Sequence, residues 1–211
     1  YDPIIMKPDQ GKPYDGKSPV SGHLSFDFIE GVNEQRLADR RNLLTQLSGS
    51  AQPTEPLEHY QQRVFDMLLD EETRRAFKVD DEPERQHHRY GSHVLGQSLL
   101  TARRLTGAAV PLVTVYAAAG DLNGSAGAHF DTHADGYNRL KKQMLPPLDQ
   151  GLSALLDDLH ESGRIDDTLV VLLTEFGRTP KVNGAGGRDH YPKVYTVGLA
   201  GAGVSEGLLY G

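Results

Sequence analysis

The sequence contains no cysteine, and this absence limits the chemistry available to its 211 residues. Without thiols the chain can form neither a disulfide framework nor a thiolate-ligated zinc site. Any bound metal must therefore use nitrogen and oxygen ligands.

Positive charge and long apolar runs are also scarce. The formal net charge is −7, whereas a nucleic-acid partner needs a concentrated basic face. No apolar run approaches the ~18 residues of a membrane-spanning helix, and the N-terminus has no basic-then-apolar targeting segment. The sequence thus predicts no membrane span and no nucleic-acid partner, and it leaves the oligomeric state open.

The length favours a single α/β domain over residues 1–211. Residues 1–30 carry four prolines and three glycines, a spacing that favours an extended lead-in. Residues 31–108 are expected to be mainly helical, and residues 109–211 to form the α/β portion. The chain starts at Tyr1 rather than methionine and stops in a glycine-rich stretch, so we expect a piece of a longer protein.

Apolar periodicity predicts four helices and three strands. The helices cover residues 34–47, 54–76, 94–105 and 148–159, and the strands cover residues 110–116, 169–173 and 195–200. Gly107 is expected to end the third helix in the left-handed conformation. The fourth helix has five leucines on one stripe, namely Leu148, Leu152, Leu155, Leu156 and Leu159.

The order strand, helix, strand predicts a right-handed parallel unit, and ligands of such sheets gather at the carboxyl ends of the strands. Glu175 follows the apolar run 169–173, and Asp131 and His133 follow the strand predicted before it. All three side chains are therefore expected at one edge of the sheet.

Asp131 and His133 stand two residues apart, so an extended backbone points both side chains to one side. One metal ion could accept both. The alternative is an aspartate that caps a turn beside a surface histidine.

Glu175 directly follows a buried run, where a carboxylate needs a cation or another partner. Arg178 could form a structural salt bridge with it, or could instead bind a phosphate or sulfate group through its planar fork.

Asp189 and His190 end a loop rich in glycine, which permits close backbone approach to a ligand. We favour Asp189 as the group that orients His190, with direct metal binding as the alternative. Arg188 is a second candidate for anion binding, and an ion pair with Asp189 is its alternative. A plain surface turn would have the same composition.

A nitrogen and oxygen ligand set of this kind suits zinc, manganese or iron. Such an ion polarises a phosphoryl or sulfuryl oxygen and activates a nucleophile. A separate cluster of His87, His88 and His93 flanks a helix full of charges, and we interpret it as a solvated surface rather than a metal site.

Four motifs occur in a recognisable order: Arg89-Tyr90-Gly91, Asp131-Thr132-His133, Glu175 to Pro180 and Gly187 to His190. With them the chain resembles an uncharacterised, sulfatase-like bacterial family, domain-of-unknown-function family 1501, within the alkaline-phosphatase superfamily. The likeness covers most of the chain and is specific from residue 85 onward.

The resemblance implies a doubly wound α/β fold, with a mostly parallel sheet, flanking helices and a metal site at its carboxyl edge. It implies that Asp131, His133 and His190 bind one metal, and that Glu175 stands where a ligand of a second metal would be. Phe176 replaces the superfamily's histidine there, so a full two-metal centre is not expected.

The activity implied is hydrolysis or transfer of a sulfate or phosphate ester of a small molecule or saccharide. The superfamily's nucleophile comes from an early strand that is absent here, so none is assigned. An extracytoplasmic location is implied by the likeness alone.

Two further interpretations stay open. The chain could be a non-catalytic member of the fold that binds an anionic ligand or saccharide in the same pocket. The charged residues around Glu175 and Asp189 could also be structural ion pairs only.

Overall fold

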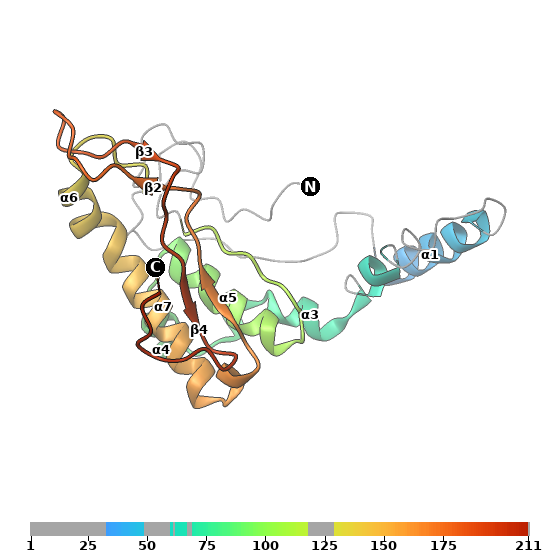
Figure 1. Ribbon diagram of the computed structural model, residues 1–211. Helices are drawn as coiled ribbons and strands as arrows, with labels where there is room; N and C mark the ends of the chain where they lie inside the picture. Colours follow the sequence, from blue (N-terminus) through green and yellow to red (C-terminus); the bar gives the residue numbers. More distant parts are fainter. Residues whose placement is uncertain (1–32, 49–59, 61, 67–68, 118–128, 211) are drawn as a thin grey trace. The chain divides into compact units, whose positions relative to one another are not determined.

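The computed structural model describes residues 33–48, 60, 62–66, 69–117 and 129–210 (Figure 1). The lead-in predicted for residues 1–30 lies outside them. The chain divides into two compact units. One comprises Tyr1–Gly22, Glu82–Arg103 and Thr114–Gly211, and the other comprises His23–Asp81 and Arg104–Val113.

The described elements of the second unit are helical. Helix α1 spans Glu34–Ser48, helix α3 spans Glu71–Ala76, and the short 3-10 turn η1 spans Val79–Asp81. Helix α1 confirms the prediction for residues 34–47. The longer helix predicted from residue 54 is found in residues 62–66 and in α3, and its first residues lie outside the described part.

The first unit is built on three helices: α4 (Glu84–Tyr90), α5 (Val94–Gly107, which runs on into the second unit) and α7 (Leu145–Glu161). Helix α4 packs against α7. Helix α5 approaches α7 where Gly151 leaves room for the Leu99 side chain. Large side chains of these helices are buried: Tyr90, Leu95, Leu99, Leu100, Leu155 and Leu159. The predicted helices over residues 94–105 and 148–159 are thus confirmed.

A buried aspartate ties the three helices together. Asp158 lies on the core side of α7 and is only 5% exposed. It accepts a hydrogen bond from the Tyr90 hydroxyl at 2.9 Å and one from Arg103 Nε at 3.2 Å, and it pairs with Arg89. Burial, followed by the Asp158 charge, raises the pKa of Tyr90, so its hydroxyl stays protonated and donates.

The histidine cluster is not a solvated surface throughout. His88 is exposed, but His93 is 6% exposed and caps the start of α5, where its Nδ1 accepts the Gly96 amide at 2.9 Å. That bond requires an unprotonated Nδ1. The prediction is wrong at His93 because its ring turns inward to accept a backbone amide of α5.

We expect this cap to make the first unit less stable in mild acid. Burial lowers the pKa of His93, the Gln150 side chain opposes that shift, and no charged group among the described residues contributes to it. The unfolded chain, with a histidine pKa of about 6.5, takes up the proton more readily than the native one. Stability attributable to His93 is therefore complete above pH ~6.5 and falls as the pH drops through the native pKa.

Urea unfolding of the native protein and of His93→Asn at pH 7.5 and pH 5 measures this effect. Asparagine keeps a capping oxygen but does not titrate. The variant should lose less stability than the native protein between the two pH values, and equal losses would contradict the role given to His93.

The strands do not form the expected sheet. Strand β1 (Val170–Leu172) pairs with β4 (Gly198–Ala200), and β2 (Gly177–Arg178) pairs with β3 (His190–Tyr191). Both pairs are antiparallel, and the described residues form no larger sheet. With 52% helix and 8% strand, the described part of the chain is mostly helical, so the prediction of a doubly wound, mostly parallel sheet is wrong.

The way in which the chain connects the strands explains why no parallel sheet forms. Parallel strands need a crossover, usually a helix, on the way back. Among the described residues the chain between β1 and β4 contains the β2–β3 pair and no helix. The segment before α7, residues 110–116, is not a strand either, and its Leu112 is 81% exposed. The strand, helix, strand unit therefore never forms.

Two details of the predicted elements also change. Leu169 and Leu173, expected to be covered on both faces of a sheet, are 49% and 64% exposed. Gly107 remains inside α5, and the left-handed residue after the helix is Ala109, with φ 57.

Candidate metal centre

The Asp131–His133 segment lies against the glycine-rich loop that leads to His190. The Arg188 amide donates to the Thr132 carbonyl at 3.1 Å. Gly187 comes so close to the His133 carbonyl that a Cβ atom would overlap it, so glycine is required at this position. The glycines in this loop thus allow two distant segments to touch.

The helices that follow also hold this segment in place. Helix α6 (Gly136–Arg139) continues through the π-helical segment η2 (Leu140–Met144) into α7. Met144 is fully buried, and Phe130 packs against it. Because Phe130 directly precedes Asp131, this contact holds the start of the Asp131–His133 segment.

The β2–β3 pair brings two further side chains to Asp131. Arg178 stands directly opposite His190 in this pair, and directly opposite residues share one face. Both reach the same carboxylate oxygen: Arg178 Nη2 lies 2.5 Å and His190 Nε2 lies 2.9 Å from Asp131 Oδ1.

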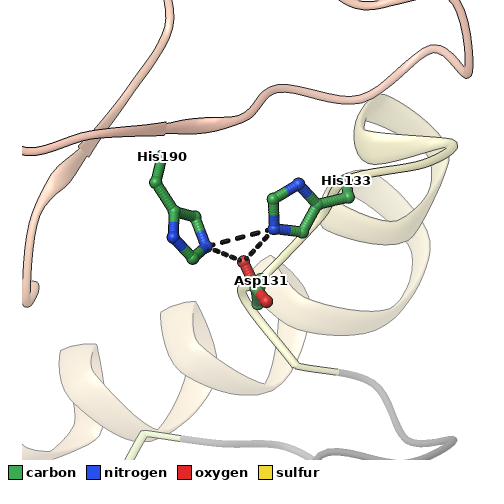
Figure 2. A group of neighbouring side chains, drawn as sticks. All are labelled: Asp131, His133 and His190. Atoms are coloured by element: carbon green, nitrogen blue, oxygen red, sulfur yellow. Dashed lines mark hydrogen bonds and ion pairs between the residues drawn. The ribbon is translucent and has the colours of Figure 1, made fainter.

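The three side chains in Figure 2 converge on a common point. His133 Nε2 lies 3.0 Å from Asp131 Oδ1 and 3.1 Å from His190 Nε2. With the 2.9 Å between Asp131 and His190, these three atoms form a nearly equilateral triangle. The side chains are 46–47% exposed, so the cluster is open to solvent.

Asp189 contacts the other ring nitrogen of His133 and thereby orients this side chain. Its Oδ1 accepts a hydrogen bond from His133 Nδ1 at 2.9 Å and another from Asn183 Nδ2 at 3.1 Å. Sequence reasoning expected Asp189 to orient His190 instead, and it did not consider Asn183.

Asn183 is held in turn by the loop. Its Nδ2 also donates to the His133 carbonyl at 3.0 Å, and its Oδ1 accepts the amides of Ala185 and Gly187 at 3.0 and 3.1 Å. An asparagine at the start of the Asn-Gly-Ala-Gly-Gly turn is the signal that would have identified it.

The electrostatics keep both carboxylates ionised. Burial would raise the pKa of Asp131, but hydrogen bonds from His190 and Arg178, together with the Arg178 charge, outweigh it and lower the pKa to about 2. The hydrogen bond from His133, and then that from Asn183, lowers the pKa of Asp189. At neutral pH the cluster therefore presents charged carboxylates.

Glu175 lies outside this cluster. Its side chain is exposed, and it does not join the group of possible ligands formed by Asp131, His133 and His190. The alternative salt bridge between Glu175 and Arg178 is not formed either, because the guanidinium of Arg178 contacts Asp131.

Arg188 also has other partners than those expected. Its Nη1 donates to the Thr179 carbonyl at 2.8 Å, and its Nη2 donates to the Tyr137 hydroxyl at 3.1 Å. These bonds connect loops around the cluster. In the described part of the chain Arg188 forms no ion pair with Asp189.

Phe176 covers one side of His190. The two ring centroids lie 4.3 Å apart, and Arg178 Cζ lies 5.7 Å from the Phe176 centroid. An apolar ring without ligand atoms thus stands beside the imidazole of His190.

In its described part the chain is mostly helical, with an exposed carboxylate and two imidazoles where the Asp131–His133 segment meets the β2–β3 pair. The chain belongs to the family described as protein of unknown function (DUF1501), whose family model matches residues 8–211. This confirms the resemblance at family level, while placement in the alkaline-phosphatase superfamily stays a prediction. Comparisons with curated proteins and with solved structures found no match. None of the described helices is long and apolar enough to span a membrane.

Proposed function

We propose that the protein is a metal-dependent hydrolase of sulfate or phosphate esters of a small molecule or saccharide. In this proposal Asp131, His133 and His190 bind a divalent ion. The link to the sulfatase-like enzymes of the alkaline-phosphatase superfamily rests on motif order alone, since the observed sheets do not support it. An extracytoplasmic location rests on the same resemblance.

One observation carries the metal site: three possible ligand atoms, Asp131 Oδ1, His133 Nε2 and His190 Nε2, lie 2.9, 3.0 and 3.1 Å from one another. The Asp189 carboxylate accepts the proton on His133 Nδ1, so a neutral His133 has a bare lone pair on Nε2. That nitrogen lies 3.0 Å from Asp131 Oδ1 and 3.1 Å from His190 Nε2. It is therefore available as a ligand for a cation bound among the three side chains.

The types of the three residues fit a divalent metal ion. Nitrogen and oxygen atoms of this kind are ordinary ligands for zinc, manganese and iron. The hydrogen bond from His133 to Asp189 is the usual support of a metal-binding imidazole, because it fixes the tautomer and ring orientation. Solvent access leaves room for a further ligand.

In this proposal a few groups of the site contribute to ester hydrolysis. A divalent ion at this point supplies polarisation of an ester oxygen and activation of a nucleophile. Arg178 pairs with Asp131 through Nη2 and donates to the Arg188 carbonyl through Nη1, so its remaining N–H groups are the ones that could meet a tetrahedral anion. Asp189 and Asn183 hold His133 in place. No side chain is assigned as the nucleophile.

A second candidate function is binding without turnover. Phe176 beside His190, and Glu175 outside the cluster, motivate it, because a second metal lacks obvious ligands there. In that case the ion and Arg178 would bind an anionic ligand or saccharide.

Turnover assays separate the two candidates. The protein, loaded in turn with zinc, manganese and iron(II), is tested on aryl sulfates and aryl phosphates. The hydrolase proposal expects metal-dependent turnover that the His133→Ala/His190→Ala double variant loses and that His160→Ala, on the exposed end of α7, keeps. Metal binding without turnover on any substrate of either class would favour the binding role, and a folded protein that binds no metal would overturn both.

A further inference from the structure

We infer that Arg188 binds a second anionic group of the substrate, on the alcohol part that leaves when the ester is hydrolysed. The preferred substrates are then sulfate or phosphate esters whose alcohol part carries a further carboxylate, sulfate or phosphate. This inference rests on the proposed function for the reacting ester and adds the chemistry of the rest of the substrate.

The positive charge of Arg188 has no acidic partner in the part of the chain that the structure describes. Its side chain donates to the Thr179 carbonyl at 2.8 Å and to the Tyr137 hydroxyl at 3.1 Å, and both acceptors are neutral. Arg178 differs, because the Asp131 carboxylate pairs with it. Arg188 is half-buried, and a guanidinium that is partly withdrawn from water without a counter-charge attracts an anion.

The guanidinium of Arg188 is held in place and still has free donors. Its two bonds come from different nitrogens, Nη1 and Nη2, so three of its five N–H groups remain for a ligand. A planar group that is already oriented loses little freedom when it binds carboxylate, sulfate or phosphate oxygens. Tyr137 is 63% exposed, so a ligand from solvent can reach the side of the guanidinium that bonds to it.

Arg188 stands beside the three proposed metal ligands without being one of them. Its amide donates to the carbonyl of Thr132, which lies between two of those ligands in the sequence. It also directly precedes Asp189, the residue that orients His133. The side-chain hydrogen bonds of Arg188 go to Thr179 and Tyr137 instead. A group bound at Arg188 therefore lies next to the reacting ester and is a separate part of the substrate.

The segment that contains Tyr137 is positively charged, although the whole chain has a net charge of −7. Residues 135–144 contain three basic residues, Arg139, Lys141 and Lys142, and one acidic residue, Asp135. Lys141 and Lys142 are exposed. Positive charge near a site raises the local concentration of anions, and most strongly that of anions with more than one charge.

Two stable anions that differ only in the second charge test this inference. Benzenesulfonate has one anionic group, and 4-sulfobenzoate has a carboxylate in addition. Each is titrated into the protein in the presence of manganese chloride, and calorimetry measures the affinity. We expect 4-sulfobenzoate to bind at least about tenfold more tightly, since hydrogen bonds between charged groups contribute a free energy that corresponds to about this factor.

Variants test whether Arg188 causes this preference. Arg188→Gln should bring the two affinities within about twofold of each other, and Arg188→Lys, which keeps the charge but not the planar fork, should keep part of the preference. Arg164→Gln is the matched control. Arg164 also donates to neutral acceptors, Ser162 Oγ and the Arg103 carbonyl, but it follows the far end of α7. This control should keep the full preference.

Three results would overturn the inference: equal binding of the two anions, no binding of either, or a preference that survives in folded Arg188→Gln. If thermal unfolding shows that Arg188→Gln does not fold, Tyr137→Phe takes its place. This variant removes one of the two bonds that orient the guanidinium and should lower the preference. An unchanged preference in both Tyr137→Phe and Arg188→Lys would overturn the inference.

Turnover of aryl sulfates and aryl phosphates is measured separately on the same protein. Turnover without a preference for 4-sulfobenzoate would contradict this inference and leave the hydrolase proposal standing. A preference that depends on Arg188, in a protein without turnover, would contradict the hydrolase proposal and support Arg188 as the site of the second anionic group.

Discussion

Replacing Asp131 with asparagine is expected to weaken divalent-metal binding by more than ~100-fold. Substitution of a residue that merely supports a metal ligand costs roughly 10- to 100-fold in affinity. Asp131 is proposed as a ligand itself and is the only one of the three that carries negative charge, so its loss should cost more.

Asp131→Asn should weaken metal binding for a second reason. In the native protein the Asp131 carboxylate also neutralises Arg178, whose Nη2 lies 2.5 Å away. Asparagine has nearly the same shape but no charge. The Arg178 guanidinium would then stand unneutralised beside the bound cation and repel it.

Isothermal titration with manganese chloride measures the change, and thermal unfolding verifies that the variant is folded. Asp149→Asn is a matched control, since Asp149 is an exposed aspartate on α7. The control should bind metal like the native protein. Native affinity in a folded Asp131→Asn protein would show that this carboxylate is not a ligand, and the triangle would then be a hydrogen-bonded cluster.

Part of the site was predictable because its signals are local. The spacing of Asp131 and His133 and the glycines before His190 indicated two loops suited to a ligand. Their meeting across 57 positions depends on backbone contacts, such as that of Gly187 with His133, which no local pattern encodes. For the same reason the partners of Asp189, Glu175 and Arg188 were not predictable.

The fold, too, was predictable only where its signals are local in the sequence. Helices α5 and α7 were predictable because a 3.6-residue period records which face a helix buries. An apolar run such as residues 169–173 carries no information about its partner strand or its direction. Whether β1 paired in parallel or antiparallel fashion was decided by the chain between β1 and β4, and the parallel expectation failed there.

The largest expected effect on stability comes from a residue that periodicity would have assigned to the core. Asp158 occupies the apolar stripe of α7 between Leu155 and Leu159. Removing one partner of a buried ion pair costs about 3–5 kcal/mol, because the remaining charge stays buried without compensation. Asp158→Ala leaves Arg89, Arg103 and the Tyr90 hydroxyl without their shared acceptor.

We expect a loss near the lower end of that range, about 3 kcal/mol. Both arginines keep a second acidic partner: Arg89 pairs with Glu161 at 2.8 Å and Arg103 with Glu82 at 3.1 Å. Their side chains are also 27% and 23% exposed, so solvent screens part of the remaining charge.

Urea unfolding at neutral pH measures the difference, with Asp157→Ala as the matched control. Asp157 is the preceding residue of the same helix, it is 67% exposed, and its contact with Arg89 is long, at 3.7 Å. Its removal should change the free energy of unfolding by no more than about 0.5 kcal/mol. If Asp158→Ala cost no more than Asp157→Ala, the contacts of Asp158 would contribute nothing net to holding α4, α5 and α7 together.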